Sequence, residues 1–201
     1  MQKISLLSGY DSATLFDKIR RKSAGEINQW PEAYFAADQI SGRLNDIFDH
    51  HRPRLPEIDW DGGKESINEK ICLLSSFQPG AKPGANVRVN VLTYEYPFQG
   101  EIYLLGCHPA QLVPESPGEC FVDPVRQVIA IEYTGFNKSP RQVLTMHRSY
   151  LSTLIASYLE LKNEFDAFNS ELPGFLHKIV EKRKQSIEDM SRILSAMQKW
   201  S

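Results

Sequence analysis

Long apolar runs are missing from this chain of 201 residues. No segment approaches the roughly 18 consecutive apolar residues that a membrane-spanning helix needs. The apolar patch that follows Met1 is far too short for a signal peptide, and no small-residue cleavage site comes after it. The sequence therefore predicts a cytoplasmic protein with no membrane segment.

Cysteine is also scarce. The three cysteines, Cys72, Cys107 and Cys120, are odd in number and scattered, which is typical of reduced thiols in a cytoplasm rather than of a disulfide framework. The paired CxxC spacing of zinc sites is absent, so no metal site is predicted. Cys107 and His108 do not make a nucleophile pair, because neighbouring residues of a strand point to opposite faces.

An excess of charge of either sign is missing too. Lys and Arg total 23 against 25 Asp and Glu, a net charge of −2, which excludes a globally basic nucleic-acid binder. The last predicted helix is locally basic, and this keeps nucleic acid as an alternative partner. The residues that would contact it are Lys178, Lys182, Lys184 and Arg192.

The signatures of common enzymes are absent as well. The chain has no GxxxxGK[ST], GxGxxG after a strand, GxSxG or HExxH, and no cofactor is predicted. Aspartate and histidine can bind divalent metals, so the acidic and histidine cluster Asp46, Asp49 and His50 is the one catalytic candidate. It precedes Pro53 at the end of a predicted helix, where His is also favoured for structural reasons.

The first 137 residues predict helices followed by a small sheet. Apolar spacing predicts a helix over 12–30, and Pro31 begins a second that Pro53 stops. Residues 67–77 fit a helix or a strand equally well. Strands are predicted over 87–93, 101–105, 119–122 and 126–133, the first two joined as a hairpin by a turn at 97–100. The fold class is α+β with about four antiparallel strands.

The C-terminal third carries the clearest pattern, opening at Ser139-Pro140. Apolar residues alternate spacings of three and four, as in a coiled-coil seam, with an interruption at 169–173 that contains Pro173. The two halves form either one kinked rod or an antiparallel hairpin. We favour the hairpin, because each apolar stripe needs a partner and the other stripe is nearest.

The hairpin makes specific predictions. A turn near Ser170 would pair Tyr158 with Arg183 inside the seam. A second stripe, Val180, Ile187 and Leu194, would need cover from the sheet, the N-terminal helices or another chain. The chain is thereby divided into a helical region (1–63), a sheet region (64–137) and a helical hairpin (138–201) that packs with the rest as one compact domain.

Part of the chain resembles a family of uncharacterised bacterial proteins. The residues that carry the resemblance are Val91-Leu92-Thr93-Tyr94-Glu95-Tyr96-Pro97-Phe98-Gln99-Gly100-Glu101-Ile102-Tyr103-Leu104, then His108-Pro109-Ala110, Pro117-Gly118-Glu119, Phe168-Asn169, Leu172 and Lys182-Arg183. They are similar, over about residues 87–194, to sheet-plus-helical-hairpin modules associated with TIR or nuclease effectors in anti-phage defence loci. Alanine after Pro109 and lysine at position 182 depart from the pattern. The resemblance implies a sensing or scaffolding role beside an effector subunit or domain.

The function expected from the sequence is therefore non-enzymatic. We expect an assembly or sensor module that binds a protein partner, or itself, through the C-terminal hairpin. One alternative is an enzyme subunit acting on nucleic acid or nucleotide through Asp46, Asp49 and His50. Another is a small-ligand sensor that uses a cleft between sheet and hairpin.

Overall fold

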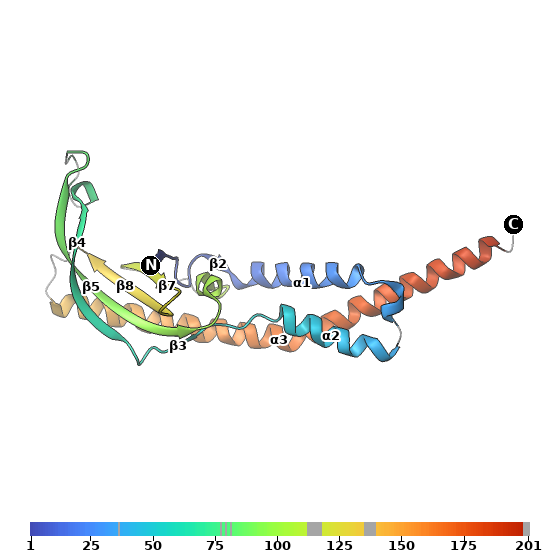
Figure 1. Cartoon of the computed structure of the whole chain (residues 1–201). Coiled ribbons are helices and arrows are strands. Elements are labelled where there is room, and N and C mark those ends of the chain that lie inside the picture. Colours follow the sequence, from blue (N-terminus) through green and yellow to red (C-terminus); the bar gives the residue numbers. More distant parts are fainter. Residues whose placement is uncertain are drawn as a thin grey trace. The chain divides into compact units, whose positions relative to one another are not determined.

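The computed structural model describes residues 1–35, 37–76, 78, 80, 82–111, 118–134 and 140–198. Ser139 and Pro117 lie outside them. The described residues form an α+β structure with three α-helices and eight strands (Figure 1). They contain no helix with an apolar stretch long enough to cross a membrane. The chain divides into two compact units, one of residues 1–11 and 54–162 and one of residues 12–53 and 163–201.

The first unit is built on an antiparallel sheet. Its strands are β1 (Gln2–Lys3), β3 (Glu57–Ile58), β4 (Lys64–Leu73), β5 (Asn86–Gln99), β7 (Glu119–Asp123) and β8 (Val128–Thr134), in the order β1-β7-β8-β5-β3 with β4 also paired to β5. A separate parallel pair joins β2 (Tyr10–Asp11) to β6 (Cys107–His108). The strand count thus exceeds the predicted four.

The predicted strands over 119–122 and 126–133 are confirmed as β7 and β8, but the hairpin through 97–100 is wrong. β5 continues through Pro97 to Gln99, and the residues after Gly100 form a 3-10 helix, η3 (Ile102–Gly106). Gly100 has a φ of +122°, and a Cβ there would lie 3.0 Å from Pro56 Cα. The chain therefore leaves β5 at a position that only glycine fits easily.

The true hairpin joins β4 to β5. Their register runs without a break from Lys64 opposite Glu95 to Leu73 opposite Asn86. β8 pairs with β5 only from Val91 to Pro97, so residues 86–90 of β5 pair with β4 alone. This two-stranded extension is the green and teal arm of Figure 1, and a short 3-10 helix, η2 (Leu74–Ser76), follows β4. The segment that the sequence left open between helix and strand is mostly strand.

The C-terminal third is one helix, α3 (Pro140–Gln198), with Pro173 inside it. The predicted antiparallel hairpin is therefore wrong, and so is the pairing of Tyr158 with Arg183, which required the chain to turn back. The two halves of α3 find partners in different parts of the chain. Within the first unit, residues of the N-terminal half of α3 pack on the sheet, where His147 bonds to Tyr96 of β5 and Tyr133 of β8.

The second unit contains helix α1 (Ser12–Asn28), a 3-10 helix η1 (Glu32–Phe35), α2 (Ala37–His51) and the rest of α3. The helix predicted over 12–30 is thus confirmed to within two residues. Phe16 of α1 stacks on Phe168 of α3 with ring centroids 4.3 Å apart and meets Phe165 edge-on at 5.3 Å. The Ser12 hydroxyl donates a hydrogen bond to the Glu164 carboxylate. Burial along this face of α3 explains why the helix continues past its proline.

Candidate interaction surfaces

The far end of α3 exposes an apolar stripe. Exposed fractions are 62% for Met190, 56% for Ile193 and 57% for Leu194, while Ile187 is half-buried. These side chains share one side of the helix, because spacings of three, four and seven residues return to the same face. Contiguous apolar surface of this kind marks an interaction site more often than scattered exposed residues do.

The stripe continues a buried one. Leu172, Leu176 and Val180 are each at most 1% exposed, and at 3.6 residues per turn they lie on the same face of α3 as Ile187 and Leu194. Of the predicted second stripe, Val180 therefore belongs to the core of its unit, whereas Leu194 is exposed. The same face of one helix changes from core to surface within about two turns.

The charged side chains of this segment lie on the other side of the helix. Arg192 forms ion pairs with Asp189 at 3.5 Å and with Glu188 at 4.0 Å, and Gln185 donates a hydrogen bond to Asp189 at 2.9 Å. Exposed pairs at these spacings contribute little stability individually, but they satisfy the charges within the helix. An approaching partner therefore meets the apolar stripe without displacing an ion pair.

The two residues of the predicted seam pair, Tyr158 and Arg183, lie in different units of the chain. Tyr158 donates a hydrogen bond from its hydroxyl to the Pro56 carbonyl at 3.0 Å and meets the Trp60 ring edge-on, so it has a structural role in the first unit. Arg183 is half-buried in the second unit, and its Nε has no hydrogen-bond partner among the described residues.

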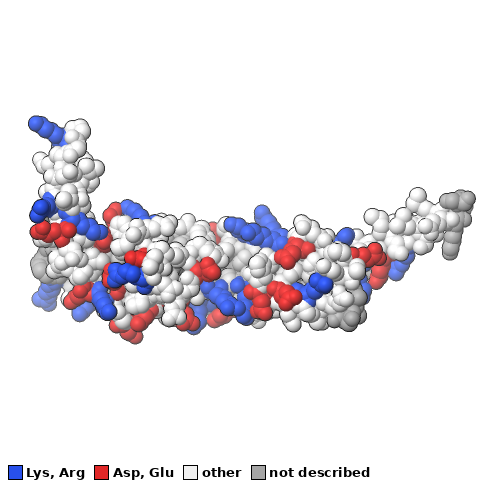
Figure 2. Space-filling view, in the orientation of Figure 1, with Lys and Arg blue, Asp and Glu red and all other residues white. Residues whose placement is uncertain are grey.

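The predicted nucleic-acid residues do not form one surface. Helical spacing puts Lys178 and Lys182 on one side of α3 and Lys184 on another, while Arg192 is engaged by two acids. On the face drawn in Figure 2, basic and acidic side chains are interspersed rather than gathered by sign. A basic stripe that could follow a phosphate backbone is not present on that face.

The structure brings two of the three catalytic candidates together. Asp46 and His50 line a hollow of about 410 Å³ in the second unit. The third, Asp49, forms an ion pair with Arg52 at 3.2 Å and does not line the hollow. No hydrogen bond joins Asp46 to His50, and the described residues contain no group of three or more His, Cys, Asp or Glu that could hold a metal ion.

The remaining side chains of this hollow are Glu26, Trp30, Arg43 and Ile47. Two of them are held by other contacts. The Glu26 carboxylate bonds to Nε2 of His51 at 2.8 Å, and the Arg43 guanidinium lies 3.3 Å from the centroid of the Tyr34 ring. No Ser, Thr or Cys lines this hollow, so a covalent mechanism on a hydroxyl or thiol has no nucleophile there.

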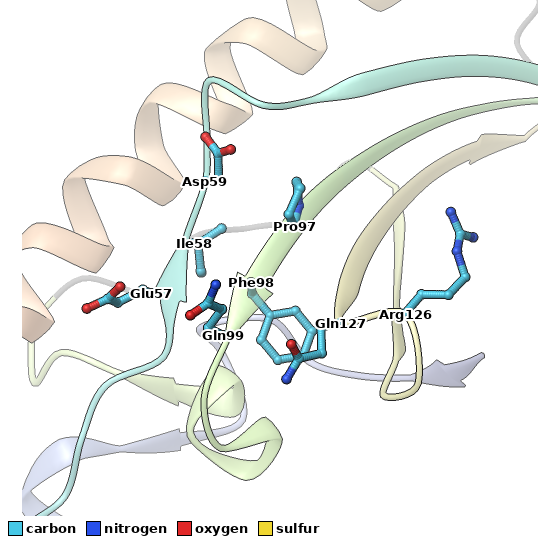
Figure 3. A pocket seen from close by; sticks show the side chains of 8 residues that line it. All are labelled: Glu57, Ile58, Asp59, Pro97, Phe98, Gln99, Arg126 and Gln127. Atoms are coloured by element: carbon cyan, nitrogen blue, oxygen red, sulfur yellow. The ribbon is translucent and has the colours of Figure 1, made fainter.

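A second hollow, of about 390 Å³, lies in the first unit where β3, β5 and the turn before β8 meet (Figure 3). Arg126 makes a two-pronged ion pair with Glu95 at 2.8 and 3.0 Å, and Asp59 accepts a hydrogen bond from the Gly62 amide at 2.8 Å. Figure 3 shows the side chains of Glu57, Asp59 and Arg126 pointing in different directions rather than converging. A ligand-sensing cleft normally presents converging polar groups, so this hollow does not resemble one.

A buried histidine that the sequence did not single out lies at the centre of the first unit. His147 is 2% exposed, and its ring stacks on Tyr94 with centroids 3.5 Å apart. Nε2 lies 2.7 Å from the Tyr96 hydroxyl and Nδ1 lies 2.9 Å from the Tyr133 hydroxyl. A neutral imidazole has one donor and one acceptor nitrogen, so one tyrosine donates to it and the other accepts from it.

The titration of this cluster follows from its burial. Desolvation lowers the pKa of His147 to about 4, raises the pKa of Tyr96 to about 12 and raises the pKa of Tyr133 as well. All three groups therefore stay neutral at physiological pH. Through its bonds to Tyr96 and Tyr133, His147 holds α3 on the sheet, and it lines neither of the two hollows described above. In the sequence, His147 is one polar member of an otherwise apolar stripe.

Comparison with known proteins adds no relative: no family model matches the chain, and neither a curated protein nor a solved structure is significantly similar to it.

Proposed function

We propose that this chain is a non-enzymatic assembly module that associates with a second copy of itself through the distal segment of α3, residues 187–198. The observation that carries the proposal is the exposed stripe of Met190, Ile193 and Leu194, which continues the buried face of the same helix. The exposed apolar side chains become buried when two such segments pair.

The positions of the charges support a second copy as the partner. If Ile187 and Leu194 are taken as the a positions of a heptad, Met190 is a d position, and the flanking e and g positions of residues 186–198 are Ser186, Ser191, Ile193 and Gln198. The charged residues of that segment, Glu188, Asp189 and Arg192, fall at b, c and f. Two identical helices can therefore meet without like-charge repulsion, and no charge selects a different partner.

The distal segment of α3 is already helical before it pairs. An isolated helix of about a dozen residues is marginal in water, because nucleation is costly. Here the segment extends a helix that is already nucleated and packed between Phe165 and Val180, so pairing does not have to order the backbone from a coil. This reduces the entropic cost that usually makes two-heptad coiled coils weak.

Substitution of Leu194 tests the proposal. We expect Leu194→Asp to weaken self-association about a thousandfold, since each of the two copies loses a buried leucine worth about 2 kcal/mol and gains a carboxylate at the contact. The measurement is molar mass by light scattering from low to high micromolar protein. The expected result is a fall in mass relative to the unsubstituted chain.

Ser195→Asp is the matched control, because it adds the same charge at the neighbouring exposed residue, a b position on the other side of the helix. It should leave the mass unchanged. The proposal is wrong if Leu194→Asp and Ser195→Asp give the same mass, or if the unsubstituted chain is monomeric over the whole range. The effector partner implied by the resemblance to defence modules stays a prediction, and the identity of the neighbouring genes tests it.

A further inference from the structure

β4 is a long, regular edge strand. Its ten residues pair one-to-one with β5, with no bulge and no proline, and among the described residues β4 pairs with no other strand. Its opposite edge therefore presents a row of unpaired backbone donors and acceptors. Three aliphatic side chains accompany that edge: Ile67 is 68% exposed, Ile71 67% and Leu73 51%.

The usual protection of such an edge is weak here. Lysine often guards an exposed edge strand, and β4 contains two. The ammonium group of Lys70, however, is bound by the Glu132 carboxylate at 2.5 and 2.6 Å on the face of the sheet that carries the buried Val91. Ile67, Ile71 and Leu73 project from the other face, because they alternate with Lys70 along the strand. That face contains no lysine of β4.

We propose that β4 pairs antiparallel with β4 of a second copy of this chain, so that the sheet continues across a twofold axis at Glu69. A twofold axis perpendicular to a sheet pairs residues that lie on the same face. In the register centred on Glu69, Ile67 lies opposite Ile71 of the second copy and Ile71 opposite its Ile67. Residues 65–73 of β4 are then all paired.

Side-chain pairing along β4 favours this register over those centred at Ile67, Asn68 and Lys70. A centre at Ile67 would place Lys64 opposite Lys70 and Glu65 opposite Glu69. A centre at Asn68 would put each isoleucine opposite a glutamate, and a centre at Lys70 would put two lysines opposite each other. In the proposed register the one like-charged pair is Glu69 with itself. Each Glu69 has an ion pair with Arg88 of its own β5 at 3.7 Å, which offsets that repulsion.

Together with the proposed pairing of α3, on which this consequence rests, β4 gives the chain two separate self-complementary contacts. One contact of this kind makes a dimer, whereas two different ones join each copy to two neighbours. We therefore expect assemblies larger than a dimer at high protein concentration. In the Leu194→Asp variant, association should stop at a dimer held by β4.

Disulfide trapping tests the register directly. Residues directly opposite across antiparallel strands have Cα atoms about 4.5–5.5 Å apart, which is within the range of a disulfide. We expect Glu69→Cys, in a Cys72→Ser and Leu194→Asp background, to form a covalent dimer when oxidised with diamide. The other two cysteines, Cys107 and Cys120, are buried and stay in place. The readout is the fraction of dimer on a non-reducing gel.

Glu65→Cys in the same background is the matched control. It removes the same exposed side chain from the same face, but the register puts its two copies about 26 Å apart, beyond disulfide reach. At least about ten times more covalent dimer from Glu69→Cys than from Glu65→Cys supports the pairing. Equal cross-linking of the two variants, or none, overturns the proposed pairing. No cross-link is also the result expected if β4 pairs with an extended segment of another protein instead of with a second copy. Since Leu194→Asp is present throughout, this outcome does not depend on whether α3 pairs.

Discussion

Phe165→Ala is expected to destabilise the second unit by about 3–5 kcal/mol, the range for removing a large aromatic side chain from a packed core. Phe165 is 2% exposed and meets Phe16 of α1 edge-on, while Phe168 stacks on the same ring. Truncation leaves a cavity and removes one side of this three-ring cluster. Urea denaturation followed by circular dichroism measures the loss as a lower transition midpoint.

Leu159→Ala provides the control, since Leu159 lies on the same helix but is 54% exposed. Its cost should stay within about 0.5 kcal/mol. If Phe165→Ala does not fold, Phe165→Leu leaves a smaller cavity and should cost less than Phe165→Ala. Equal midpoints for the Phe165 and Leu159 variants would contradict the packing of α1 on α3.

The helices could be predicted where their apolar faces were regular. α1 followed from Leu15, Ile19 and Ile27, which are all buried in the structure. The seam of α3 was recognised, but its partner was not. Periodicity shows that a stripe needs cover and cannot show what covers it. Here one half packs on the sheet and the other on α1, so the two halves do not need each other.

The turn predicted at Pro173 was wrong for a related reason. A proline inside a helix loses a backbone hydrogen bond and crowds the preceding turn, a cost of about 3 kcal/mol, so a turn was expected there. In the structure Leu172 and Leu176, on either side of it, are both 1% exposed. Their burial offsets the cost of the proline, and burial of that kind depends on tertiary contacts that a local pattern does not contain.

The sheet shows the same limit at Pro97. The segment 97–100 has the composition of a turn, yet Pro97 is part of β5 and lies opposite Val128 of β8. On the other side of β5, the pairing with β4 ends at Glu95 and that with β3 begins at Phe98. A proline is tolerated in this gap because no strand there needs its amide. β4 was ambiguous because nearly all its side chains are exposed. Its apolar residues therefore follow neither the two-residue period of a half-buried strand nor the 3.6-residue period of an amphipathic helix.

The candidate sites divide in a similar way. The stripe of α3 that contains Ile187 and Leu194 was predicted from its amphipathic spacing, but the sequence did not show which part of it is exposed. The spacing of four residues that brings Asp46 and His50 together is also a sequence property. The environment of His147 is not, since Tyr96 and Tyr133 come from strands whose pairing places them beside α3. A polar residue in an apolar seam was the one signal available.

That histidine makes stability depend on pH. The pKa of His147 is lowered from 6.5 to about 4 in the folded chain, because burial disfavours the imidazolium ion. The unfolded chain therefore binds more protons than the folded chain below pH 6.5, and the stability contributed by His147 falls as the pH drops from above 6.5 towards 4. Linkage gives a loss of about 2 kcal/mol between pH 7 and pH 5.

His147→Phe isolates this contribution. At pH 7 the variant should be less stable by about 2–4 kcal/mol, because the Tyr96 and Tyr133 hydroxyls, in side chains at most 4% exposed, lose their partner. Its stability should also fall about 2 kcal/mol less than that of the unsubstituted chain when urea denaturation is repeated at pH 5. His177→Gln, which removes an exposed histidine from the same helix, should keep the full pH dependence. An unchanged pH dependence in His147→Phe would mean that the imidazole is already solvated or charged in the folded chain, and that the tyrosine cluster does not hold α3 on the sheet in the way described.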